Sequence, residues 1–284
     1  MINSVPAGGG IDRIPVYLQA LQTMKSSASP SLQDHISLTY HWLRVGVGVL
    51  ALSLPVVLAL LGTAAYGLNL QDSISAYYHA FVPTAQFPDR YALSGNGLMR
   101  NWFVGILWAI GFFLILYKGF GRRESRALNL AGLLLIMVSM FPMGWTCRDA
   151  CPQVSLHGVS AILFFLAIGY VCIFRSGDTL VLLPERQQSA YRKIYRIIGL
   201  SMWIFPLAVA VLETARIKLF GSHTVFFVEA VGIWTFASFW LIKSREIALS
   251  GADTAVTSGR LMRPTRKKGI IGYWLDTSPL TIAD

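Results

Sequence analysis

This sequence contains serine, histidine and acidic residues of the kinds found in metal-dependent hydrolytic sites. Ser75 and His79 are four residues apart in the segment SISAYYH, so on a helix their side chains share one face. His157 and His223 lie further along the chain, and three imidazoles with one water form a common catalytic zinc site. In that arrangement the three histidines would bind zinc, and Ser75 would donate a hydrogen bond to a developing oxyanion.

The sequence also allows less specific interpretations of these residues. No two of the three histidines form an HxxxH pair, so they converge only if the fold brings them together. Histidines near a membrane surface are commonly solvated or hydrogen-bonded, and a histidine pair would also suit axial ligation of haem. Ser75 is not predicted to be a nucleophile by motif, because neither GxSxG nor SxxK is present.

Glu229 is the candidate catalytic base or proton carrier. It follows His223 by six residues, which on a helix places it about 9 Å deeper in an apolar segment. A carboxylate in such surroundings must be paired, protonated or next to water, so a purely structural hydrogen bond is the alternative. We expect Tyr78, Arg100 and Asn101 to line the same pocket, with Arg100 and Asn101 as candidate partners of Glu229.

The elements that must position these residues are transmembrane helices. Of the 284 residues, 54% are hydrophobic and 13% are charged, and the mean hydropathy of +0.55 is typical of a membrane protein. An apolar segment of about 20 residues crosses a bilayer as a helix, since lipid offers no hydrogen bonds to the backbone. The sequence therefore predicts an all-α bundle of six spans, at residues 45–68, 101–120, 127–145, 154–174, 194–212 and 224–242.

Lysine and arginine residues gather in alternate segments around these spans. They are frequent before the first span, between the second and third, between the fourth and fifth, and in the tail. This pattern predicts a multi-pass protein of a bacterial inner membrane, with both termini cytoplasmic and the polar pocket facing outward. The net charge of +10 then reflects topology, so membrane lipids are the expected partners and nucleic acid is not.

Three domains follow from the same pattern. Residues 1–41 form a cytoplasmic segment in which residues 14–24 have the spacing of an interfacial helix, and residues 42–243 form the transmembrane domain. Residues 244–284 form a basic cytoplasmic tail that is predicted to be disordered. In the outer loop between the third and fourth spans, Cys147 and Cys151 are predicted to form a disulfide.

Several segments resemble a family of uncharacterised bacterial six-span integral membrane proteins. The segments are SISAYYH, RNWFVG, LHGVSA and FVEAVGIW, within residues 73–243. The resemblance implies an integral membrane protein but brings no established activity, and family members usually carry Asp where this chain has Asn101. A more distant similarity links Ser75 and His79 to alkaline ceramidases and adiponectin-type receptors, which are zinc-dependent membrane hydrolases, although their HxxxH pair is absent here.

Three functions remain open from the sequence. The first is binding of a lipid or small molecule in the outward-facing pocket, without catalysis. The second is zinc-dependent hydrolysis of a lipid, with Ser75 and Glu229 as the catalytic residues. The third is that of a small transporter or a haem protein, in which Glu229 would carry protons.

Overall fold

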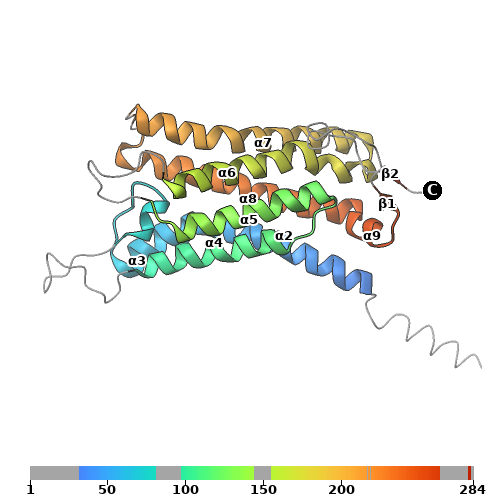
Figure 1. Cartoon of the computed structure of the whole chain (residues 1–284), viewed down its shortest axis with the longest axis horizontal. Coiled ribbons are helices and arrows are strands. Elements are labelled where there is room, and N and C mark those ends of the chain that lie inside the picture. The colour runs from blue at the N-terminus through green and yellow to red at the C-terminus, as the bar shows by residue number, and fades with distance from the viewer. Residues whose placement is uncertain are drawn as a thin grey trace, which may run out of the picture.

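The computed structural model describes residues 32–80, 97–143, 155–215, 217, 219–262 and 281–282. Long helices lie side by side along the longest axis of the molecule, and successive helices run in opposite directions (Figure 1). The long helices are α2 (Leu32–Val56), α4 (Leu98–Leu116), α5 (Arg122–Met140), α6 (Leu156–Tyr170), α7 (Glu185–Thr214) and α8 (Thr224–Ser250).

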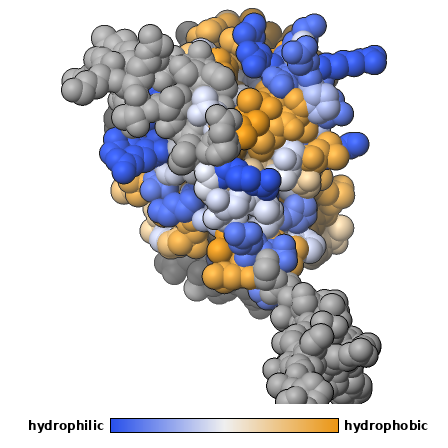
Figure 2. Space-filling view, turned by 90° about the vertical axis from the view of Figure 1, so that its right-hand side faces the viewer, coloured by the Kyte–Doolittle hydropathy of each residue, from blue (hydrophilic) through white to orange (hydrophobic). Residues whose placement is uncertain are grey.

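Shorter elements continue some of these helices or cover the two ends of the bundle. They are η1 (Val57–Leu61), α3 (Gly62–Tyr66), η2 (Ser75–Tyr78), η3 (Val171–Arg175), η4 (Ser176–Leu182), η5 (Gly221–His223), α9 (Ala252–Thr257), β1 (Leu261–Met262) and β2 (Thr281–Ile282). The end that carries α3 and η2 is called the η2 end below, and the opposite end is called the α9 end. Figure 2 faces the α9 end, where hydrophilic residues lie among hydrophobic ones.

Five helices in the described part of the chain are long and apolar enough to cross a membrane. They cover Leu32–Ala65, Leu98–Leu116, Leu156–Leu182, Glu185–Leu212 and Gly221–Ser250. The protein is thus a multi-pass membrane protein, and the residues that the structure describes are all-helical apart from one short strand pair. The predicted third span corresponds to α5, which packs between α4 and α6 but begins with the charged residues Arg122, Arg123, Glu124 and Arg126. A sixth span therefore stays a prediction.

Three helices extend well beyond the boundaries expected from hydropathy. α2 begins at Leu32 rather than at residue 45, α7 begins at Glu185 rather than at residue 194, and α8 continues past residue 242 to Ser250. Arg44, Lys243 and Glu246 lie inside these extensions and are buried, because other elements supply their polar partners. The first extension passes the expected end of the N-terminal segment at residue 41. Residues 14–24, proposed as an interfacial helix, lie outside the described residues.

The helices pack through an apolar core and, at two places, through paired glycines. A Cβ atom at Gly111 of α4 would lie 2.9 Å from the Gly132 carbonyl oxygen of α5. A Cβ atom at Gly199 of α7 would lie 3.0 Å from the Gly169 carbonyl oxygen of α6. Such close backbone contacts are the usual role of small residues between transmembrane helices, so glycine is required at these crossings.

Candidate functional site

A serine and a histidine meet at the η2 end. Ser75 is the first residue of η2, and its Oγ lies 2.9 Å from Nε2 of His157 in the first turn of α6. The start of α6 is fixed by Ser155, whose side chain accepts a hydrogen bond from the Gly158 N–H at 3.0 Å. His157 is only 8% exposed, whereas Ser75 is half-buried. The fold thus places a shielded imidazole behind a partly accessible hydroxyl.

The other nitrogen of His157 contacts the last turn of α5. Nδ1 lies 2.9 Å from the Val138 carbonyl oxygen and 3.0 Å from the Phe141 carbonyl oxygen. Carbonyl oxygens only accept hydrogen bonds, so in the neutral ring Nδ1 carries the proton. Nε2 is then an acceptor, and the Ser75 hydroxyl donates to it. This is the orientation in which an imidazole can take a proton from a serine.

The three predicted zinc ligands have different partners. His79 Nε2 lies 3.0 Å from the Met143 carbonyl oxygen, and His223 Nδ1 lies 3.3 Å from the Gln71 carbonyl oxygen. In the described part of the chain no group of three or more His, Cys, Asp or Glu side chains is placed to hold a metal. The structure therefore does not support zinc bound by His79, His157 and His223. The reason is that both nitrogens of His157 already have protein partners.

Glu229 and Arg100 both hold the η2 segment through its backbone. Glu229 is half-buried in α8, and its Oε2 accepts a hydrogen bond of 2.7 Å from the Ile74 N–H, just before η2. Arg100 of α4 donates from Nε to the Tyr78 carbonyl oxygen at 2.8 Å, and its guanidinium carbon lies 4.7 Å from the centre of the Tyr78 ring. The sequence suggested Glu229 and Arg100 as partners of each other. In the structure each holds the η2 segment by a backbone hydrogen bond, Glu229 from α8 and Arg100 from α4.

Tyr77 fills the buried side of η2. It is 1% exposed, and its ring centre lies 6.3 Å from that of Phe226 in α8. Burial raises the pKa of the Tyr77 phenol, so this group stays protonated at neutral pH. The phenol therefore contributes packing at this site and not a negative charge.

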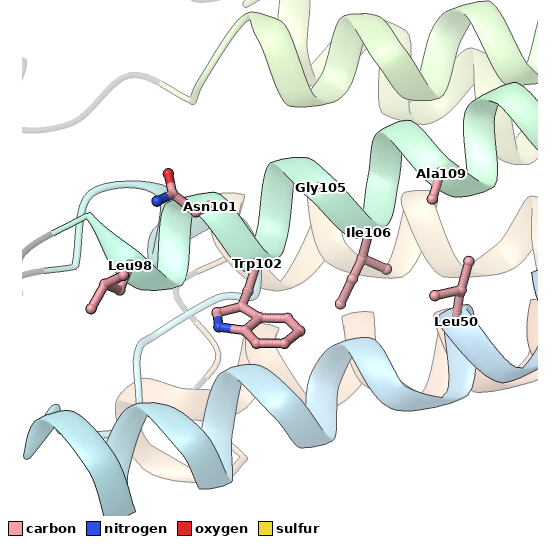
Figure 3. Close-up of a pocket in the computed structure, with 7 residues that line it drawn as sticks. All are labelled: Leu50, Leu98, Asn101, Trp102, Gly105, Ile106 and Ala109. Atoms are coloured by element: carbon pink, nitrogen blue, oxygen red, sulfur yellow. The ribbon is translucent and has the colours of Figure 1, made fainter.

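An apolar groove opens between α2 and the first half of α4, which starts at the η2 end (Figure 3). Its volume is about 300 Å³, and its walls are Leu50, Leu98, Asn101, Trp102, Gly105, Ile106 and Ala109. Asn101 and Trp102, near the start of α4, are exposed. Predicted pocket residue Asn101 thus lines this groove, and Arg100 is its neighbour in sequence.

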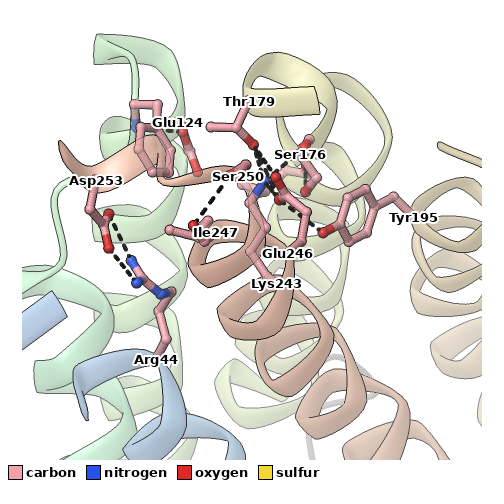
Figure 4. A network of polar contacts seen from close by, with 12 residues as sticks. Arg44, Glu124, Ser176, Thr179, Tyr195, Lys243, Glu246, Ile247, Ser250 and Asp253 are labelled. Carbon is pink, nitrogen blue, oxygen red and sulfur yellow. Dashed lines mark hydrogen bonds and ion pairs between the residues drawn. The ribbon is translucent and has the colours of Figure 1, made fainter. Parts of the chain in front are cut away.

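A second polar network lies at the α9 end and was not anticipated as a site from the sequence (Figure 4). Arg44, 1% exposed, donates to both carboxylate oxygens of Asp253, at 3.2 Å and 2.6 Å. Lys243 donates to the Thr179 hydroxyl at 2.7 Å and also pairs with Glu246. Glu246 accepts a further hydrogen bond of 3.2 Å from Tyr195.

These contacts join α2 to α9 and α8 to η4 and α7, which is a structural role. The sequence signal was the i, i+3 spacing of Lys243 and Glu246 directly after an apolar run. Hydropathy alone assigned Arg44 and Lys243 to the flanks of spans. Cys147 and Cys151, the predicted disulfide, lie outside the described residues.

Comparison of the chain with protein-family models, with curated proteins and with solved structures finds no match. The family resemblance of the quoted segments is therefore carried by those segments alone. Any function must be argued from the geometry of the two ends of the bundle.

Proposed function

We propose that this multi-pass membrane protein binds a phospholipid at the η2 end. One acyl chain would lie in the groove between α2 and α4, and the phosphate would lie beside Arg100. The groove is the observation that carries this proposal. Its volume of about 300 Å³ is at the lower end of the range for small-molecule sites, and most of its walls are apolar.

The length of the groove suits one leaflet of a bilayer. From Leu98 to Ala109 the α4 helix rises roughly 16 Å, at about 1.5 Å per residue. The hydrocarbon core of a bilayer is about 30 Å thick, so the groove spans about half of it. A methylene group that enters the groove would exchange contacts with lipid for contacts with protein. The gain in binding free energy therefore comes mainly from shape complementarity and van der Waals packing.

Arg100, a cation in the first turn of α4, indicates which headgroup would bind. It is exposed and contacts Tyr78, and it lies at the same end of α4 as the groove residues Leu98, Asn101 and Trp102 but does not itself line the groove. Guanidinium groups bind phosphate oxygens in bidentate geometry. Trp102 has an indole N–H at the same level, as is common at membrane interfaces. An anionic phospholipid such as phosphatidylglycerol therefore fits both parts of the site.

A substitution that fills the groove tests this proposal. A Cβ atom at Gly105 would meet nothing within 4 Å, so Gly105→Phe adds a ring in the groove without a backbone clash. We expect wild-type protein purified with phosphatidylglycerol to retain bound lipid in native mass spectrometry, and Gly105→Phe to lose it. The control is Leu133→Phe on α5, a position 52% exposed and outside the groove, which should retain lipid.

Substitution at Arg100 separates the contribution of the lipid headgroup to binding from that of the acyl chain. Arg100→Gln should lower the preference for phosphatidylglycerol over phosphatidylcholine and leave binding of the acyl chain intact. Equal lipid retention by wild-type and Gly105→Phe proteins would show that the groove is not the binding site.

A further inference from the structure

We propose that Ser75 and His157 form a serine–histidine pair that cleaves a carboxylic ester of the bound phospholipid. This inference rests on the lipid site proposed above and adds a reaction to it. It needs no metal, and it assigns Ser75 as the nucleophile and His157 as the base. The observations that carry it are the two sets of hydrogen bonds of His157.

The hydrogen bonds determine how the imidazole is used. Nδ1 faces two carbonyl oxygens, of Val138 and Phe141, and Nε2 lies 2.9 Å from the Ser75 hydroxyl oxygen. In serine hydrolases a third group orients the histidine so that its free nitrogen faces the serine. Here two backbone carbonyls do so. They carry only partial charges, so they stabilise an imidazolium less than a carboxylate would, and slow turnover follows.

The serine is held by contacts that keep η2 in place. The Ile74 N–H donates to Glu229, and the Tyr78 carbonyl oxygen accepts from Arg100. These bonds fix the backbone on both sides of Ser75, from α8 and from α4. Because Ser75 is half-buried while His157 is 8% exposed, substrate and the hydrolytic water can reach the base only from the side of the Ser75 hydroxyl.

The short helix η2 carries both the serine and the tyrosine that Arg100 contacts. A 3-10 helix has about three residues per turn, so residues i and i+3 are eclipsed. Ser75 and Tyr78 are related in this way, and Tyr78 lies under the Arg100 guanidinium. A phospholipid whose phosphate binds Arg100 therefore has its ester groups, a few bonds from the phosphate, within reach of Ser75.

The reaction would proceed in two balanced steps. Ser75 Oγ bonds to the ester carbonyl carbon while its proton moves to His157 Nε2, and the ester C–O bond then breaks as the leaving alkoxide takes that proton. Water next attacks the acyl group, gives a proton to Nε2, and the bond from the acyl carbon to Oγ breaks as Oγ regains the proton. The products are a fatty acid and a lysophospholipid.

An alkyl fluorophosphonate tests the nucleophile directly. We expect wild-type protein to form a covalent adduct at Ser75, located by mass spectrometry of the modified peptide. His157→Gln should lower the labelling rate by about a hundredfold, which is typical of removing a general base. The matched control is His79→Gln, which should label normally because His79 Nε2 contacts the Met143 carbonyl oxygen.

The outcomes separate this inference from the lipid site. Phosphatidylglycerol vesicles with ester-linked chains should release fatty acid in the presence of wild-type protein, and vesicles with ether-linked chains should not. Protein that retains lipid in native mass spectrometry but forms no adduct at Ser75 would overturn the reaction and leave the lipid site standing. An adduct at Ser73, the neighbouring serine, or equal labelling of the His157→Gln protein would overturn it as well.

Discussion

Individual side chains at the η2 end act largely on the backbone of one short helix. Glu229 holds the N–H of Ile74, and Arg100 holds the carbonyl oxygen of Tyr78. Between them lies Ser75, whose hydroxyl meets the buried ring of His157. Small changes at Glu229 should therefore alter how η2 is held.

Substitution of Glu229 tests this at the residue scale. Glu229→Gln keeps an oxygen that can accept from the Ile74 N–H, so we expect a small loss of thermal stability in detergent. Glu229→Leu leaves that donor without its acceptor, which costs about 1–3 kcal/mol. Thermal unfolding followed by circular dichroism compares the two variants. A Glu229→Leu protein that melts with the wild type would show that this bond contributes little.

Sequence reasoning identified most of these residues but not their roles. Ser75, His79 and His157 were selected by residue type and spacing, and Glu229 was selected because a carboxylate is costly in an apolar segment. The ring orientation of His157 depends on carbonyls at the end of α5, and no local spacing encodes that contact. Three histidines were accordingly assigned to one metal, whereas the structure gives each its own partner.

Glycine residues decide how closely neighbouring helices approach each other in this bundle. The α4–α5 crossing has Gly111 against Gly132, and the α6–α7 crossing has Gly169 against Gly199. Helix positions were largely predictable because hydropathy reports where a chain can enter lipid. The crossing points were not, since α4 and α6 each contain a second glycine, Gly105 and Gly158, that could equally have faced a neighbour.

An alanine at a crossing should separate two helices. Gly111→Ala would place Cβ 2.9 Å from the Gly132 carbonyl oxygen, and overpacking of this kind costs about 1–3 kcal/mol. The control is Gly105→Ala on the same helix, where Cβ meets nothing within 4 Å and alanine favours the helix. We expect a lower unfolding temperature for Gly111→Ala and an unchanged or higher one for Gly105→Ala. The opposite order would show that α4 and α5 are not in backbone contact.

The orientation of the protein in the membrane is a property of the whole molecule. The distribution of lysine and arginine predicts that the α9 end faces the cytoplasm and the η2 end faces outward. Asp72, with a side chain 71% exposed, lies at the η2 end, whereas Arg122 and Glu185 are exposed at the start of α5 and α7.

Single cysteines at these positions report the orientation. In a background with Cys147 and Cys151 replaced by serine, the remaining Cys172 is buried. Asp72→Cys should react with a membrane-impermeant maleimide in intact cells. Arg122→Cys and Glu185→Cys should react only after permeabilisation. Labelling of Arg122→Cys in intact cells would reverse the orientation and move the proposed lipid site to the cytoplasmic leaflet.

The pair formed by Arg44 and Asp253 has a consequence for biosynthesis. The two residues are 209 positions apart, so a ribosome must translate almost the whole chain before they can meet. Until then Arg44, at the α9 end of a helix that enters the bilayer early, lacks its carboxylate partner and retains the Tyr117 hydroxyl, at 3.4 Å, as a side-chain hydrogen-bond partner. A nascent chain that stops before α9 lacks Asp253, so a cation that is buried in the complete protein has no carboxylate partner. Completion of synthesis thus becomes a condition for assembly, and truncated products remain recognisable to membrane proteases.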